Sequence, residues 1–195
     1  MLMKLTTVLK PESMVILPEY NQNGLLCSKV YDVNDSYVFE NSPMNIIKNT
    51  LLYFLNDLET AIRGSKSILG SYKMLPIVIC DNLRMYWFPS HSPFNRNCIW
   101  FSLIHIDDIK PINKSRCLVI FKNGLLIEVN MSAKRLMHKR DLASTLKLKI
   151  EERKQAAESH HLLEMGLMYI RELNERYFTT NKSKYHMEQK EDGME

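Results

Sequence analysis

The sequence predicts an α+β fold, mainly an antiparallel sheet, with one internal helix and two C-terminal helices. Three observations support this class. Runs of β-branched and aromatic residues, which are typical of strands, recur over residues 14–41 and 75–130. One apolar stripe with helical spacing interrupts these runs after residue 42. Two further stripes of this kind follow residue 132, so the helices are expected mainly at the C-terminal end.

Three strands are expected in the first forty residues. Residues 14–19 and 25–33 flank a polar turn that ends at Gly24. Residues 36–41 follow the turn-forming pair Asn34–Asp35. This spacing indicates strands that run antiparallel to one another.

The internal helix is predicted to begin at Ser42–Pro43, because serine is a favoured N-cap and proline fits the first turn. Apolar residues then recur every three or four positions, and Gly64 is the expected end of the helix. Residues 65–73 are interpreted as a moderately basic loop or a short extra turn.

Strands are predicted again at residues 75–80, 84–89 and 98–106. The last of these contains Cys98 and His105, seven positions apart. Side chains alternate faces along a strand, so the two are expected on opposite faces and cannot share a metal or form a nucleophilic pair. We expect Cys98 to be a small buried apolar residue and His105 to satisfy its ring by local hydrogen bonds.

The pair Asn123–Gly124 between two apolar alternating runs is a strong hairpin signal. Residues 98–106, 116–122 and 125–130 are therefore predicted to form an antiparallel meander, with Asp107–Asp108 as turn residues. A partly closed meander with a terminal helix, as in pleckstrin-homology domains, is one architecture that fits.

Two amphipathic helices are expected after Ser132. The first makes residues 1–155 a β-rich core that ends in a basic helix. The second, residues 156–178, carries an apolar face that serves either packing on the sheet or self-association. The polar residues 179–195 are expected to form a disordered tail.

The chain of 195 residues is 45% apolar and 25% charged, which is the composition of an ordinary globular protein. It has no run of 18 apolar residues, so no membrane partner is expected. Its four cysteines are scattered without a C-x-x-C pair. That pattern favours free thiols in a reducing cytoplasm over a zinc site or a disulfide scaffold.

The positive charge is concentrated in one segment. Residues 134–154 contain eight basic and three acidic residues, a local net charge of +5, whereas the whole chain carries +4. A basic element on a nearly neutral body is typical of a polyanion-binding face, and a solvated helix face is the alternative.

Sequence motifs for catalysis or phosphate binding are absent: there is no G-x-x-x-x-G-K-[ST], G-x-G-x-x-G or G-x-S-x-G pattern. His160 and His161 point about 100° apart on a helix, and a histidine four residues before Glu164 is better explained by a solvated face than by a metal ligand. We expect no enzyme, no catalytic residue, no metal site and no cofactor. An enzyme that uses Cys98 or Cys80 is a weaker alternative.

The order and spacing of several stretches resemble a known family over most of the chain. These stretches are LPEYNQNGLLCSKV (17–30), PMNII (43–47), LPIVICDN (75–82), YWFPS (86–90), Cys98-x-Trp100 with LIHI (103–106), FKNGLLIEVNMS (121–132) and IRELNERY (170–177). Together they resemble the ComK competence transcription factors of Gram-positive bacteria.

This resemblance implies a DNA-binding activator of DNA-uptake genes that recognises paired A/T-rich promoter boxes through the minor groove. It also implies homodimers that assemble into tetramers, and control by an adaptor that delivers the protein to a Clp-type protease. A narrow A/T-rich groove concentrates negative potential, so a protein that binds it needs cations more than a base-edge code.

The candidate DNA contacts lie in two sets. One set comes from the basic segment, and the other comes from loops in the first half of the chain. The residues are Lys134, Arg135, Lys139, Arg140 and Lys147, with Arg63, Lys66, Lys73 and Arg96.

The chain departs from the family pattern in two places. Family members carry Arg-Ser-Cys, Gly-Ser-Ser and Gly-Arg stretches after Pro43, whereas residues 49–64 here are apolar and partly acidic, and Asp57 and Glu59 would repel phosphate. The short aromatic-proline segment associated with adaptor binding has no clear counterpart between residues 154 and 162. The chain is therefore interpreted as a divergent member or paralogue. A regulatory protein that pairs with a ComK relative without tight DNA binding is the alternative.

Overall fold

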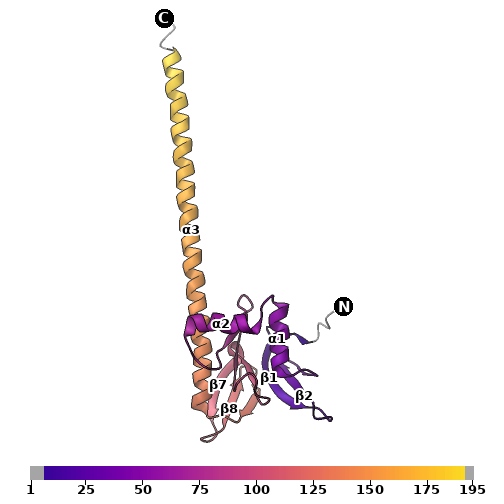
Figure 1. Ribbon diagram of the computed structural model, residues 1–195. Coiled ribbons are helices and arrows are strands. Elements are labelled where there is room, and N and C mark those ends of the chain that lie inside the picture. Colours follow the sequence, from indigo (N-terminus) through magenta and orange to yellow (C-terminus); the bar gives the residue numbers. More distant parts are fainter. Residues whose placement is uncertain (1–6, 192–195) are drawn as a thin grey trace. The chain divides into compact units, whose positions relative to one another are not determined.

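A computed structural model of the protein describes residues 7–191, and the side chains of residues 7–173 (Figure 1). The chain forms two compact units, residues 1–149 and 150–195. Nine strands and three α helices lie in the described residues, and the strands pair antiparallel. The predicted α+β class with mainly antiparallel sheets is therefore confirmed.

The larger sheet has six strands in the order β3-β2-β1-β6-β5-β4. The strands are β1 (Ser13–Tyr20), β2 (Leu26–Asp32), β3 (Ser36–Phe39), β4 (Ile77–Cys80), β5 (Met85–Pro89) and β6 (Trp100–Ser102). The first six of the eight predicted strand segments contribute to this sheet, although the sixth of them is much shorter than expected. Its centre joins β1 to β6, so segments about 85 residues apart in the sequence are direct neighbours, with Val15 opposite Phe101.

The smaller sheet has three strands in the order β7-β8-β9. The strands are β7 (Ile106–Pro111), β8 (Cys117–Phe121) and β9 (Leu126–Val129). The predicted hairpin at Asn123–Gly124 joins β8 to β9, and Gly124 has φ 88°, which glycine adopts without strain. With two separate sheets, a partly closed, pleckstrin-homology-like arrangement is not confirmed.

The main hydrophobic core lies between the larger sheet and the helices α1 (Pro43–Tyr53) and α2 (Leu58–Leu69). Helix α1 contributes Ile46, Ile47 and Leu51, and the sheet contributes Trp87 and Trp100. Apolar burial on this scale is the main stabilising contribution to the fold. The predicted start of α1 is confirmed, since the Ser42 hydroxyl accepts a hydrogen bond from the Asn45 backbone N–H at 3.3 Å.

The prediction of one internal helix is wrong, because two helices occupy this segment. Helix α1 ends at Tyr53, and Asp57 caps α2 by accepting a hydrogen bond from the Thr60 backbone N–H at 2.9 Å. Gly64 lies inside α2, and the helix ends at Gly70, which has φ 90°. One glycine costs a helix only about 1 kcal/mol, which packing readily offsets.

The prediction of one strand over residues 98–106 is also wrong. Strand β6 holds three residues, a 3₁₀ turn η2 (Leu103–His105) follows, and β7 then pairs with β8 in the other sheet. The chain crosses between sheets here, so Asp107 and Asp108 lie in a strand rather than a turn. The ring of His105 is within hydrogen-bonding distance of the Pro11 carbonyl at 2.7 Å, a partner far away in the sequence and not the local one expected.

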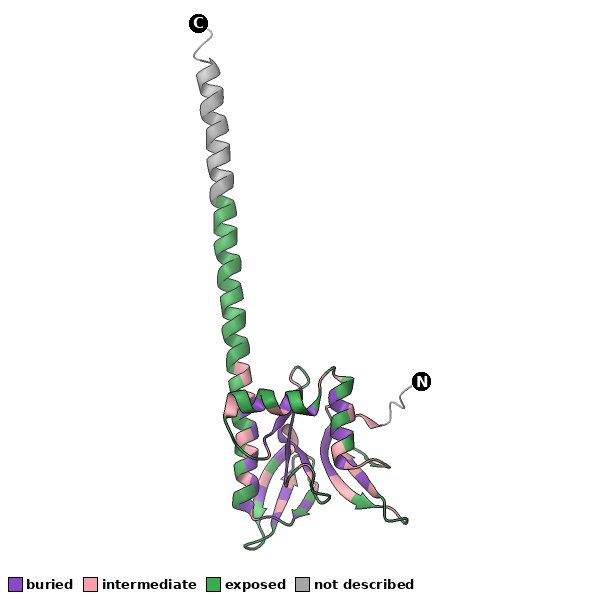
Figure 2. Ribbon diagram, in the orientation of Figure 1, coloured by how far each residue is buried: buried purple, intermediate pink, exposed green. Residues whose placement is uncertain are grey.

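The two predicted C-terminal helices form one continuous helix, α3 (Ala133–Glu191). The residues at the predicted break are Lys154, Gln155, Ala156 and Ala157, all of which are strong helix formers, so nothing stops the helix there. From residue 152 to residue 173 every side chain is exposed, and Figure 2 shows this stretch in green. The predicted boundary at residue 155 and the predicted tail 179–195 stay predictions; the side chains of that tail lie outside the described residues.

Candidate nucleic-acid interface

A groove with four cations lies between the loop after α2 and the beginning of α3, and we call it the basic groove. It has a volume of about 390 Å³. The lining residues are Tyr72, Lys73, Met74, Lys134, Arg135, His138, Lys139 and Leu142. None of these eight carries a carboxylate. The structure therefore brings together four of the nine residues predicted to contact DNA, from two segments about 60 residues apart.

Contacts between α3 and the segment around the end of α2 hold the two walls of the basic groove together. Leu136, Ala143 and Leu146 are buried and fix the first part of α3 on the body of its unit. The rings of Tyr72 and His138 meet edge to face with centroids 6.1 Å apart. The Lys149 ammonium donates a hydrogen bond to the Ile68 carbonyl at 3.3 Å. These contacts hold together the two backbone segments that carry the cations.

Lys139 lies at the floor of the basic groove and is only 8% exposed. Its ammonium donates to the Met74 thioether sulfur at 3.5 Å, and sulfur is a weak acceptor. Among the described residues, no carboxylate forms an ion pair with it. Burial lowers the pKa of Lys139 below its usual value; the nearby Cys98 opposes this shift, and the Arg135 charge adds to it. An anion in the groove would supply the counter-charge that the protein does not.

The charges of the basic groove also affect His91, at the beginning of the 91–97 loop, and Cys98, directly after it. Burial lowers the pKa of His91, and the charges of Lys139 and Arg135 lower it further. Burial raises the pKa of the Cys98 thiol, which donates to the His91 carbonyl at 3.4 Å. The thiol is thus kept protonated and enclosed, as expected for a small buried residue rather than a nucleophile.

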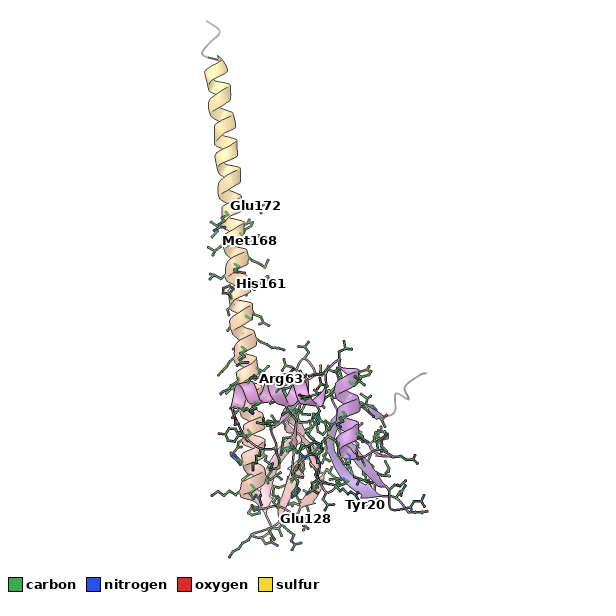
Figure 3. All side chains as sticks on the ribbon, viewed as in Figure 1. Tyr20, Arg63, Glu128, His161, Met168 and Glu172 are labelled. Carbon is green, nitrogen blue, oxygen red and sulfur yellow. The ribbon has the colours of Figure 1, made fainter. Side chains whose placement is uncertain are left out.

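The other predicted contacts lie outside the basic groove. Arg63 and Lys66 are exposed on α2, where Figure 3 labels Arg63, whose guanidinium donates to the Thr60 hydroxyl at 3.3 Å. Arg96 lines a different hollow, beside Pro43 at the beginning of α1. Arg140 pairs with Asp141 at 3.5 Å. Lys147 is half-buried.

Sequence reasoning missed Tyr72, Met74 and His138, which complete the lining of the basic groove. Tyr72 precedes the predicted contact Lys73, and His138 precedes Lys139. Their nearness to predicted cations was the available signal. Their pairing across the groove depends on the tertiary fold.

Three further properties concern the described residues only. No cluster of three or more histidine, cysteine, aspartate or glutamate side chains that could hold a metal occurs in it. Nor does any described helix combine the length and the apolar character that crossing a membrane requires. All four cysteines are free, and three of them are buried.

The fold and the groove define a small α+β protein with one face suited to a polyanion. A comparison with known protein families then identifies the family of the chain. Residues 5–155 match the family described as ComK protein, and the chain belongs to this family. The suspected resemblance is thus confirmed over most of the first unit and the beginning of α3.

One relative among curated proteins is the competence transcription factor of Bacillus subtilis (strain 168). It is 22% identical to this chain over 120 residues, which is 62% of either protein. The match therefore spans less than two thirds of the relative's length. No solved structure matches the chain.

Proposed function

We propose that the protein is a DNA-binding transcriptional activator of competence genes and that the basic groove receives the phosphate backbone. The observation that carries this proposal is Lys139, a buried ammonium without a carboxylate partner among the described residues, at the floor of a groove with three further cations. Membership of the ComK family and the name of the relative support the same function. Neither points to an enzyme.

The chemistry of the groove suits a phosphate. Lys73, Lys134 and Arg135 stand at the surface and can each neutralise a phosphate oxygen, releasing counterions from the DNA. Lys139 would be reached only by an anion that enters the groove. Because this arrangement holds phosphates rather than base edges, recognition of A/T-rich boxes would depend on the width and potential of the minor groove.

The remaining predicted cations are proposed as outer contacts. Arg63, Lys66 and Arg96 are exposed and available to flanking phosphates. Arg140 and Lys147 are expected to contribute less, since Arg140 already pairs with Asp141 and Lys147 is half-buried. Charges at the rim of an interface mainly change the association rate and its salt dependence.

Self-association is proposed for the outer part of α3. Its exposed apolar side chains cluster within twelve residues: Leu162, Leu163, Met165, Leu167, Met168, Tyr169, Ile170 and Leu173. A patch of this kind marks an interaction surface. A homodimer, or a tetramer built from two of them, would present several basic grooves to paired DNA boxes. A Clp-protease adaptor is a further proposed partner, and the cytoplasm is the proposed compartment.

The test is fluorescence anisotropy of a labelled duplex with two A/T tracts, against a G/C-rich duplex of equal length, at several salt concentrations. We expect binding that weakens steeply with salt and favours the A/T duplex by more than about tenfold. Weak and equal binding to both duplexes would contradict the proposal.

Such a result would favour the alternative, a regulatory protein that pairs with a ComK relative without tight DNA binding. The exposed carboxylates of Asp57 and Glu59, in the segment that departs from the family pattern, are the observation behind this alternative. Co-purification with a ComK relative, together with the absence of A/T preference, would support it.

A further inference from the structure

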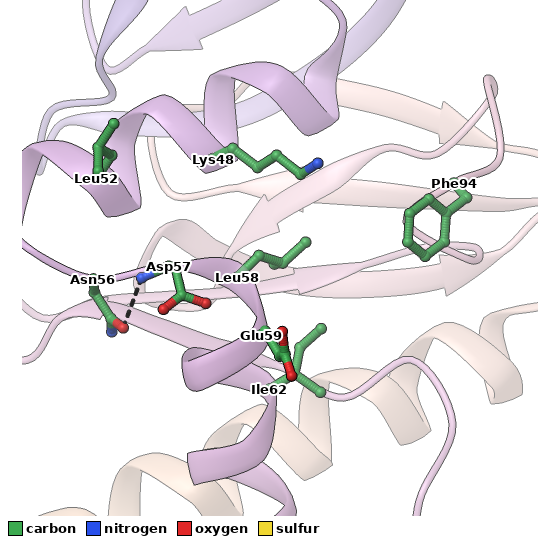
Figure 4. Close-up of a pocket in the computed structure, with 8 residues that line it drawn as sticks. All are labelled: Lys48, Leu52, Asn56, Asp57, Leu58, Glu59, Ile62 and Phe94. Atoms are coloured by element: carbon green, nitrogen blue, oxygen red, sulfur yellow. Dashed lines mark hydrogen bonds between the residues drawn. The ribbon is translucent and has the colours of Figure 1, made fainter.

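A second groove in the first unit is apolar, and we call it the apolar groove. It lies between α1, α2 and the 91–97 loop and has a volume of about 550 Å³. Its lining residues are Lys48, Leu52, Asn56, Asp57, Leu58, Glu59, Ile62 and Phe94. Figure 4 shows Leu52, Leu58, Ile62 and Phe94 around its interior. Phe94 is 83% exposed, an unusual state for a large apolar residue.

One exposed apolar side chain, that of Leu55, lies beside the apolar groove, and we call it the knob. Leu55, in the turn between α1 and α2, is 96% exposed and has φ 60°. That backbone region disfavours side chains with a Cβ, so leucine costs stability here without giving any burial in return. A glycine or asparagine would satisfy the turn better. A leucine exposed to this degree is available for contact with a partner.

The rim of the apolar groove carries charges of both signs. Lys48 on α1 is exposed at one side, and Asp57 and Glu59 are exposed at the beginning of α2. The Asp57 carboxylate stays ionised, because its pKa is lowered chiefly by the hydrogen bond from the Thr60 backbone N–H. Two such surfaces related by a twofold axis can place Lys48 of each copy against the acidic side of the other.

We propose that the apolar groove is a self-association surface that binds the same surface of a second copy. Leu55 of each copy enters the groove of the other, and Lys48 of each copy pairs with Glu59 of the other. A twofold interface requires one patch that complements itself, and this patch combines a knob, a hollow and opposite charges. The inference deepens the proposed self-association by adding a surface distinct from the outer part of α3.

A charge exchange tests the proposed pairing in the full-length protein. Lys48→Glu and Glu59→Lys should each weaken self-association at least about tenfold in analytical ultracentrifugation. The double variant Lys48→Glu/Glu59→Lys should regain the original association constant within about threefold. An equimolar mixture of the two single variants should also associate, because a twofold interface between them pairs opposite charges at both contacts.

Failure of both rescues would overturn the proposed surface. Pairing within one chain would restore the double variant but not the mixture, and that outcome would also contradict the proposal. Unchanged association of the single variants would do the same.

Leu55→Gly removes the knob while it relieves the backbone. We expect at least about tenfold weaker self-association and an unchanged or higher melting temperature. Leu25→Gly, which removes another exposed leucine outside the groove, is the matched control and should leave association unchanged. Full association of Leu55→Gly would contradict the proposal.

The readouts also separate this inference from the proposed DNA-binding function. Loss of association by Leu167→Glu/Ile170→Glu alone, with Leu55→Gly unaffected, would assign all self-association to α3 and overturn the apolar surface. Rescue by charge exchange in a protein without A/T preference would retain the surface and reject the DNA-binding proposal.

Discussion

The two grooves of the first unit differ in chemistry, although α2 leads into both. At its beginning, Asp57 and Glu59 stand at the rim of the apolar groove. At its end, Lys66 in the last turn precedes the loop that supplies Lys73 to the basic groove. Acidic residues at a helix N-terminus and basic residues at its C-terminus both agree with the helix dipole. The requirements for a stable helix thus also separate a surface that repels phosphate from one that attracts it.

The altered segment 49–64 contributes no residue to the lining of the basic groove. Its carboxylates lie at the apolar groove, and the eight residues that line the basic groove include none of them. The segment that departs from the family pattern therefore lines the apolar groove, and the four cations of the basic groove come from other segments. If the two grooves act independently, a change at one groove should leave the binding measured at the other nearly unaltered.

Reversal of two charges at the basic groove should have the largest effect. Lys134→Glu/Arg135→Glu should weaken binding to the A/T duplex by about 100-fold or more and reduce the slope of log affinity against log salt by about 2, since two phosphate contacts are lost. Anisotropy titrations over a salt series measure both quantities. Lys110→Glu/Lys122→Glu, which changes one residue in β7 and one directly after β8, is the control and should change affinity less than about threefold. Equal losses in both pairs would mean that no groove is involved.

Lys139→Met should separate stability from binding. Removal of the buried ammonium should raise the free energy of unfolding by about 1 kcal/mol. The same change should weaken DNA binding by about tenfold, because the groove loses the charge at its floor. Urea denaturation and anisotropy report the two effects. Lower stability of the variant would show that Lys139 has a partner that stabilises the fold.

The pH dependence of unfolding should also change in this variant. The pKa of Lys139 in the folded protein is lowered, so between this pKa and the ordinary lysine value the unfolded chain binds more protons than the folded one. Stability of the unmodified protein should therefore rise with pH across that window, and below it the full cost of burying the ammonium remains. The difference between the protein and Lys139→Met should shrink as the pH rises. A constant difference would contradict the lowered pKa.

A smaller effect is expected from Arg140→Glu/Lys147→Glu, the pair to which the basic helix pattern alone would give a central role. Arg140 already pairs with Asp141 and Lys147 is half-buried, so the affinity loss should be about fivefold, well below that of the groove pair. The same duplex and salt series allow a direct comparison. A loss as large as that of Lys134→Glu/Arg135→Glu would place the DNA along the helix rather than in the groove.

Glu59→Gln should have the smallest effect on DNA binding, less than about twofold, while it weakens self-association. The change removes one carboxylate from the apolar groove and keeps the side-chain volume. Parallel anisotropy and ultracentrifugation on one preparation would measure both. A large gain in DNA affinity would show that the acidic segment lies against the DNA.

Local signals predicted the fold well where local interactions decide it. Ser42–Pro43 begins a helix and Asn123–Gly124 makes a hairpin because the backbone preferences of these residues act within a few positions. Gly64 was expected to end a helix, but packing on β4 and the core overrides one glycine. The break at residues 103–105 arises from a crossing between sheets, which depends on contacts distant in the sequence.

The candidate site was predicted in part for the same reason. Lys134 and Arg135 belong to a segment whose local charge is visible in the sequence. The burial of Lys139 and the arrival of Tyr72 and Met74 across the groove depend on how α3 packs against the loop after α2. The charge pattern thus identified the helix, and the structure identified which part of it forms a cavity.

The complete enclosure of Trp87 and Trp100 has a practical consequence. These are the only two tryptophans in the chain, and they are 1% and 0% exposed in the core behind the larger sheet. Neither lines the basic groove or the apolar groove. Intrinsic fluorescence should therefore be blue-shifted and insensitive to DNA or to self-association, and should move to longer wavelength only when the core opens. Tryptophan fluorescence should therefore report unfolding of the core and should not respond to what binds at either groove.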